Sequence, residues 1–218
     1  INDSVCPKFE YREMTFWNIF DAQFSVKSRI NGSVVRQLGP EWGGSVGYVG
    51  GVGGIVHTFS RLMPPEIYFQ DHPECFALNE QGERDPSGLC TTNKMTLSVV
   101  TENVLNWLKN DPDGIVSVSI NDGDVAYCSC KKCRQIERAE GGKAGLILQF
   151  VNAVAERVAE VYPKAKVDTI VYGKVLEVPK HVRPASNVLI RVCGSIIRSH
   201  PISQYKKYRN EPELRAVY

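Results

Sequence analysis

Three cysteines fall close together, at Cys128, Cys130 and Cys133, and this cluster constrains the structure of the chain more than any other feature. A C-x-C-x-x-C pattern either binds a soft metal ion through its thiolates or forms disulfides. The cluster follows an apolar run, 114–120, and a polar turn, 121–124, that holds two carboxylates. In α/β proteins the residues just past a buried strand usually carry the chemistry. The pattern therefore predicts an extended functional loop after this strand.

A structural zinc ion usually takes four ligands, so the cluster needs a fourth. Cys90 and Cys193 are both candidates, because each ends a predicted strand on the same rim. The alternative is a disulfide in an exported protein, for instance between this loop and Cys90, and free thiols are the third interpretation. We do not expect a catalytic cysteine, since no histidine lies near the cluster in the sequence to activate a thiol. The candidate metal ligands are Cys90, Cys128, Cys130 and Cys133.

Short apolar runs alternate with amphipathic stretches along the chain. Helical periodicity is clear at 96–109 and at 146–162. Strands are predicted at 9–16, 55–59, 88–93, 114–120, 166–172 and 187–193. Strands that alternate with helices favour parallel βα units. We therefore expect one α/β domain over 1–218, a parallel, TIM-barrel-like (β/α) fold, incomplete at about six strands because a closed barrel typically needs about 250 residues.

Polar residues recur at the predicted carboxyl ends of these strands, which meet at one edge of a parallel sheet. Asp122 and Asp124 are the candidate catalytic carboxylates, either as a general acid or as contacts to a sugar. A plain Asn-Asp-Gly-Asp turn is the alternative interpretation of the same residues. The candidate substrate-binding residues at this edge are Arg12, His57, Asn121 and Tyr172.

Charge and hydropathy exclude two broad classes of partner. The chain has 26 basic and 24 acidic residues, a net charge of +2, and no basic stripe with interleaved aromatics. It therefore has no electrostatic footprint for nucleic acid. Its apolar runs fall short of the roughly 18 residues of a membrane span. The chain begins at Ile1 rather than at Met, which leaves room for a targeting segment that has been removed.

The sequence also resembles a known family. Its closest motifs are Ser117–Asp122 and the C-x-C-x-x-C cluster, within a similarity that extends from Phe9-Glu10-Tyr11-Arg12 to the His200-Pro201 region. It resembles an uncharacterised bacterial family, domain of unknown function 4838, grouped with glycoside hydrolase barrels of the alpha-glucuronidase and beta-hexosaminidase type. The resemblance implies a carbohydrate-active barrel, exported to the periplasm or outside the cell, without an established reaction. Such domains continue past His200-Pro201, so we expect a C-terminal truncation.

Two functions follow from these observations. The first is a glycoside-hydrolase-like protein that acts on or binds a complex, uronic-acid-containing glycan, with Asp122 as acid or contact and no cofactor needed for catalysis. The second is a non-catalytic carbohydrate-binding or scaffold barrel with a structural cysteine or zinc loop. Whether the chain is an enzyme stays open at this point. Besides a glycan, we expect a second copy or a partner chain to cover the open edge of an incomplete sheet.

Overall fold

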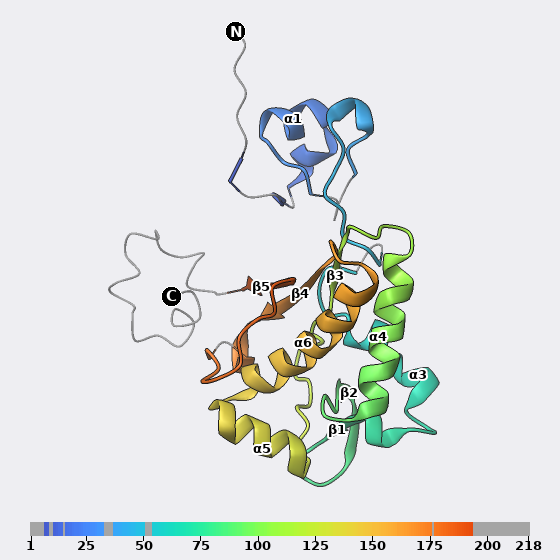
Figure 1. Cartoon of the computed structure of the whole chain (residues 1–218), viewed down its shortest axis with the longest axis vertical. Helices are drawn as coiled ribbons and strands as arrows, with labels where there is room; N and C mark the ends of the chain where they lie inside the picture. The colour runs from blue at the N-terminus through green and yellow to red at the C-terminus, as the bar shows by residue number, and fades with distance from the viewer. Residues whose placement is uncertain are drawn as a thin grey trace, which may run out of the picture.

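The computed structural model describes residues 7–8, 11–14, 16–32, 37–50, 54–175 and 177–193. In this part of the chain helices pack beside two small sheets (Figure 1). The first sheet is an antiparallel hairpin, and the second is parallel with the order β3-β4-β5. The strands are β1 (Phe76–Leu78), β2 (Arg84–Leu89), β3 (Ile115–Ser117), β4 (Lys166–Val171) and β5 (Val188–Val192).

Helices of very different lengths connect these strands. The α-helices are α1 (Ala22–Lys27), α2 (Phe59–Leu62), α3 (Pro65–Tyr68), α4 (Lys94–Leu108), α5 (Lys131–Glu140) and α6 (Lys143–Val161). Single 3₁₀ turns are η1 (Trp17–Phe20), η2 (Pro40–Trp42), η3 (Pro73–Cys75) and η4 (Gly173–Val175). Helix α1 lies at one end of the molecule, and α5 lies with the hairpin at the other (Figure 1). None of the described helices has the length and apolar character needed to cross a membrane.

The two long helices form where the sequence predicts them. Helix α4 begins at Asn93, whose side chain accepts hydrogen bonds from two backbone N–H groups of the first turn. Such a cap satisfies donors that the helix itself leaves unpaired. Helix α6 makes the crossover from β3 to β4 and buries Phe150, Val151 and Val154 in the main core. Burial of this apolar stripe is the main stabilising contribution of the helix.

The predicted barrel is wrong. Within the described residues the parallel sheet has three strands, extended only by a single bridge between Tyr48 and Ile115, and it does not close. The predicted strands at 114–120, 166–172 and 187–193 contain β3, β4 and β5. These three strands alone form the parallel sheet, so the βα alternation held only for the last part of the chain.

The other predicted strands failed for local reasons. The segment 88–93 overlaps only the end of β2, which pairs antiparallel with β1 because a turn containing Gly82, at φ +85°, reverses the chain. The segment 55–59 leads into α2. It was predicted as a strand because a short apolar run does not distinguish a strand from a buried helix. In the segment 9–16, residues 11–14 form no strand, and Phe9, Glu10 and Thr15 lie outside the described residues.

Candidate functional site

Four cysteine thiols meet where β2, the 121–130 loop and α5 come together. The Sγ atoms of Cys90, Cys128, Cys130 and Cys133 all lie within 4.8 Å of one another. The Sγ atom of Cys90 is 3.8 Å from that of Cys130 and 4.0 Å from that of Cys133. Tetrahedral Zn–S bonds of about 2.3 Å place pairs of sulfur atoms about 3.8 Å apart. The group therefore has the dimensions of a four-thiolate metal centre.

Backbone contacts fix the positions of these cysteines. Cys90 directly follows β2, and its N–H donates to the carbonyl of Cys75 at 2.8 Å. The backbone N–H and the Oγ of Ser129 both donate to the carbonyl of Leu78 at 2.7 Å. In return, the N–H of Leu78 donates to the Sγ of Cys128 at 3.4 Å. These hydrogen bonds attach the loop to β1 directly beside the cluster.

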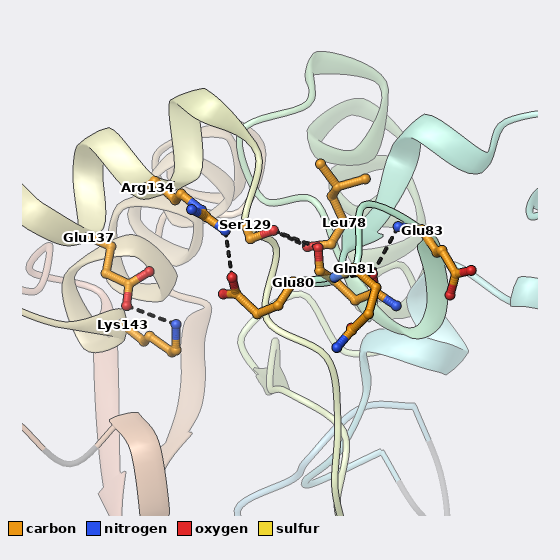
Figure 2. Close-up of polar contacts among 9 residues, drawn as sticks. Leu78, Glu80, Gln81, Glu83, Ser129, Arg134, Glu137 and Lys143 are labelled. Carbon is orange, nitrogen blue, oxygen red and sulfur yellow. Dashed lines mark hydrogen bonds and ion pairs between the residues drawn. The ribbon is translucent and has the colours of Figure 1, made fainter.

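Charged side chains add further links around the cluster. Figure 2 shows Arg134 of α5 paired with Glu80 in the hairpin turn, with an N–O distance of 2.6 Å. It also shows Lys143 of α6 paired with Glu137 of α5 at 2.8 Å. The Arg134–Glu80 pair is exposed, and exposed pairs stabilise a fold by no more than about 1 kcal/mol. The first pair links α5 to the hairpin, and the second links α5 to α6.

The protonation of the cluster shows why a cation suits it. Hydrogen bonds from the thiols of Cys128 and Cys133 lower the pKa of the Cys90 thiol. The hydrogen bonds with Cys128 and Cys90, together with burial, raise the pKa of the Cys133 thiol. Without a cation the group therefore keeps protons on some sulfurs, because several buried thiolates repel one another. A bound metal ion would allow all four to ionise.

A threonine hydroxyl lies against the sulfurs from outside the cluster. The Oγ1 of Thr92 is 3.2 Å from the Sγ of Cys133 and 3.6 Å from that of Cys90. Groups in this position orient metal ligands and tune their basicity. The sequence analysis did not single out Thr92. Its position two residues after Cys90, in the turn before α4, is the signal that could have identified it.

The alternatives weighed for the cysteines can now be compared. All six cysteines in the described part of the chain are free thiols, so the predicted disulfide does not form there. Cys193 is exposed at the end of β5, whereas Cys90 is buried and completes the group. The fourth position is therefore Cys90. The four-cysteine group could hold a metal ion, as the sequence predicted.

At the carboxyl ends of β3 and β4 the structure brings together three of the predicted rim residues. The hydroxyl of Tyr172 donates to the Oδ1 of Asp122 at 3.3 Å. The rings of His57 and Tyr172 meet edge to face, with centroids 5.8 Å apart. The pKa of Asp122 is lowered, mainly by a hydrogen bond from the N–H of Gly123 and to a smaller extent by the charge of His57. An ionised carboxylate accepts hydrogen bonds from a ligand more readily than it donates a proton.

Two other predicted contacts are placed differently. The side chain of Asn121 accepts a hydrogen bond from the N–H of Ser60 and donates to the carbonyl of Ser87, so it ties loops together. The guanidinium of Arg12 donates to the carbonyl of Arg29, just after α1. Helix α1 lies at the opposite end of the molecule from the hairpin (Figure 1). Arg12 therefore contacts the segment that follows α1.

Asp124 lines a separate polar hollow of about 300 Å³. Gly123, at φ +84°, lies between the two aspartates and turns the chain. Asp122 consequently contacts Tyr172, whereas Asp124 lies at the hollow between the hairpin turn, the 124–127 segment and the start of α6. The residues lining this hollow are Asn79, Glu80, Gln81, Asp85, Asp124, Val125, Ala126, Tyr127 and Lys143.

The sequence analysis missed a buried charged pair in the parallel sheet. The Oδ1 of Asp168, on β4, lies 3.5 Å from the Nε of Arg191, on β5, and the Arg191 guanidinium also contacts the hydroxyl of Tyr48. Burial raises the pKa of Asp168 to about 6. An aspartate in the middle of a predicted buried strand was the available signal. The pair links β4 to β5 on the face of the sheet away from α6.

Comparison with known proteins gives one match. The model of a family described as "Domain of unknown function (DUF4838)" matches residues 1–215 of the chain. No curated protein and no solved structure matches it. The match confirms the predicted domain family, whereas the predicted relation to alpha-glucuronidases and beta-hexosaminidases stays a prediction.

Proposed function

We propose that this chain, which belongs to the DUF4838 family, is a carbohydrate-binding domain whose ligand-binding walls are held together by a structural zinc ion. One observation carries the proposal: four thiols from the end of β2, the 121–130 loop and α5 lie within 4.8 Å of one another. A tetrahedral set of four sulfurs suits zinc or iron. Zinc is our assignment, and elemental analysis separates the two metals.

The proposed metal is structural because of its ligand count. A catalytic zinc ion keeps one position open for water or substrate, whereas four cysteines leave none. Three of the four cysteines are buried, and Cys130 is half-buried. The ion would join the hairpin to α5, because these two parts of the chain make few apolar contacts with each other. The small core here consists of Ala77, Cys90, Cys128, Cys133 and Leu146.

The proposed glycan site is the polar hollow beside this centre. Its walls are the hairpin turn and the loop that leads into the cysteines, which are the two segments that the ion would join. Tyr127 contributes an aromatic ring, with the Lys143 ammonium 5.3 Å from its centroid, and Asn79 and Gln81 offer planar amides that pair with hydroxyl groups. A concave surface with a few placed polar groups is the usual form of a small-ligand site.

The charge of the hollow favours neutral or amino sugars over uronic acids. Glu80 and Lys143 line it but are paired with Arg134 and Glu137, so the carboxylates of Asp85 and Asp124 leave the hollow negative. Negative charge repels the carboxylate of a uronic acid and attracts the ammonium group of an amino sugar. Arg12, a candidate substrate-binding residue whose cation would suit a uronic acid, instead donates to the carbonyl of Arg29, just after α1.

Glycoside hydrolysis is the second candidate function. Two carboxylates, Asp85 and Asp124, line the same hollow, and hydrolysis of a glycosidic bond needs such a pair. The Oδ1 of Asp85 accepts a hydrogen bond from the N–H of Ser87 at 2.8 Å, which fixes its position. Release of reducing sugar from a bound oligosaccharide distinguishes this candidate from binding alone.

Isothermal titration with neutral, amino-sugar and uronic-acid oligosaccharides tests the site. We compare the wild type with Asp124→Asn, in the hollow, and with Asp122→Asn, a matched change at the rim. The proposal expects binding of a neutral or amino-sugar oligosaccharide that Asp124→Asn weakens about tenfold or more and that Asp122→Asn leaves unchanged. Loss of binding only in Asp122→Asn would move the site to the rim. Absence of binding across the panel would refute the glycan assignment.

A further inference from the structure

One of the four clustered cysteines is more accessible than the others. Cys130 is half-buried, whereas Cys90, Cys128 and Cys133 are buried. Cys130 is also the N-cap of α5, so it lies where the 121–130 loop ends and the helix begins. The susceptibility of a cysteine to oxidation follows its thiolate character and its exposure. An oxidant that approaches the cluster from solvent therefore reaches Cys130 first.

The proposed metal centre would keep this cysteine in its reactive form. A cysteine that binds a metal ion is a thiolate, and the thiolate rather than the thiol is the nucleophile in cysteine chemistry. A metal-bound Cys130 is thus both charged and partly open to solvent. These are the properties of cysteines that respond to peroxides.

Cys90 is a partner within reach of Cys130. Their Sγ atoms lie 3.8 Å apart, and a disulfide bond joins two sulfurs at about 2.05 Å. The two sulfurs therefore have to approach each other by less than about 2 Å to bond. Both cysteines are free thiols in the structure, so the bond is absent from the reduced chain.

Cys133 is the competing partner, because it follows Cys130 by three positions in the C-x-x-C part of the cluster. A Cys130–Cys133 bond would lie within the start of α5 and would join it to no other segment. A Cys90–Cys130 bond would instead link two residues that are forty positions apart. Disulfides that close longer loops restrict the unfolded chain more, so this second bond stabilises the fold more strongly.

We infer that Cys90 and Cys130 form a redox exchange site, at which a peroxide replaces the metal ion by a disulfide between these two cysteines. The inference rests on the proposed metal centre and adds a second, oxidised state to it. The disulfide would join the end of the hairpin to the start of α5, which are the segments that the ion would join. The hairpin would therefore stay attached to α5 in reducing and in oxidising surroundings.

The exchange takes two steps with hydrogen peroxide as the oxidant. The Cys130 thiolate attacks one peroxide oxygen, the O–O bond breaks, and a sulfenic acid and a hydroxide ion form. The Cys90 thiolate then attacks the sulfur of the sulfenic acid, and the S–O bond breaks to release a second hydroxide ion. Two solvent protons convert both hydroxide ions to water, so the two thiolates lose the two electrons that the peroxide gains.

The loss of two thiolates also explains why the ion would leave. Only Cys128 and Cys133 would remain as thiolate ligands in the cluster. A structural zinc ion takes four protein ligands, so two are too few to retain it. Release of the ion and formation of the disulfide are therefore expected to occur together.

One molar equivalent of hydrogen peroxide, added to the zinc-loaded whole chain, tests the inference. A zinc-binding dye follows release of the ion. Mass spectrometry of proteolytic peptides, after alkylation of the free thiols, identifies the bonded cysteines. Cys193→Ser is the control variant, because this exposed thiol lies outside the cluster. Calorimetry compares the Tm of the oxidised chain with that of the reduced chain from which a chelator has removed the metal.

The inference expects about one zinc ion to be released for each Cys90–Cys130 disulfide, in the wild type and in Cys193→Ser alike. The oxidised chain should unfold about 5 °C or more above the reduced, metal-free chain, because the disulfide restricts the unfolded state. Zinc that stays bound, a Cys130–Cys133 disulfide, or equal Tm values for the two metal-free forms would overturn the exchange alone. A chain that holds no zinc before peroxide is added would refute the metal centre and the exchange with it.

Discussion

The sulfur atoms of Cys90 and Cys130 lie 3.8 Å apart, although forty positions separate the two residues in the chain. This is the separation of about 3.8 Å that two thiolates take on one tetrahedral zinc ion. The contact joins the end of the antiparallel hairpin to Cys130, the residue just before α5. The hairpin turn and the 124–127 segment, which leads into the cysteines, line the polar hollow, so the proposed ligand site lies next to the metal centre.

Removal of the metal should destabilise the chain. We expect a strong chelator to lower Tm by roughly 10 °C or more, because a structural zinc ion contributes directly to the free energy of folding. Differential scanning calorimetry with and without chelator measures the change. The exposed thiol of Cys193 provides a control, since Cys193→Ser should respond to chelator as the wild type does. An unchanged Tm in a demetallated sample would contradict the structural role.

Thr92 should tune the affinity of the metal centre. Thr92→Val removes the hydroxyl that lies 3.2 Å from the Sγ of Cys133, and we expect metal affinity to fall about tenfold. The neighbouring Thr91→Val is the matched control, because the Thr91 hydroxyl is buried without a partner in the described structure and makes no such contact. Competition with a zinc-binding dye measures both affinities. Equal affinities in the two variants would show that Thr92 plays no part.

Asp168 should make stability fall as pH rises. Burial raises its pKa to about 6 in the folded chain, against 3.8 for a free side chain. Below about pH 4 both states are protonated, and between pH 4 and 6 only the unfolded state ionises freely, so the free energy of unfolding drops by up to about 3 kcal/mol. Urea titrations at pH 4.5 and 7 should show about 2 kcal/mol of this drop in the wild type and not in Asp168→Asn. The exposed Asp113→Asn should retain it.

Asp122 and Tyr172 should titrate together. The pKa of the Tyr172 phenol is raised, mainly by burial and to a smaller extent by the charge of Asp122. Asp122→Asn removes that charge, so we expect the pKa of Tyr172 to fall toward its usual range. NMR of the labelled tyrosine ring over an alkaline titration follows this group directly. If the Tyr172 titration curve is the same in both proteins, the two side chains do not form the contact described above.

The sequence predicted the parts of the fold that depend on long local patterns. Helices α4 and α6 follow from their apolar periodicity, and β3, β4 and β5 from buried runs near them. The predicted barrel was wrong because short apolar runs such as 55–59 were counted as strands. Whether such a run pairs as a strand depends on distant partners, which periodicity does not reveal. Helix α5 was missed because its ten residues are mostly polar.

The candidate site was predictable where chemistry and position coincide. Cys90 follows a strand and carries the residue type that the cluster lacked, so it could be named as a fourth ligand. Arg12 could not be excluded from the rim, since its position depended on a first strand that does not form at 11–14. The separation of Asp122 from Asp124 depends on the left-handed backbone of Gly123, which a sequence pattern does not fix.

The most direct test of the account is the metal content of the purified chain. Elemental analysis by mass spectrometry should find about one zinc ion per chain in the wild type and in Cys193→Ser, as one four-ligand site requires. Cys130→Ser, which removes one of the four clustered thiols, should lose most of it. Iron in place of zinc would contradict the identity of the ion. A wild-type chain that holds no metal and exposes four titratable thiols, or zinc content unchanged in Cys130→Ser, would contradict the metal centre itself.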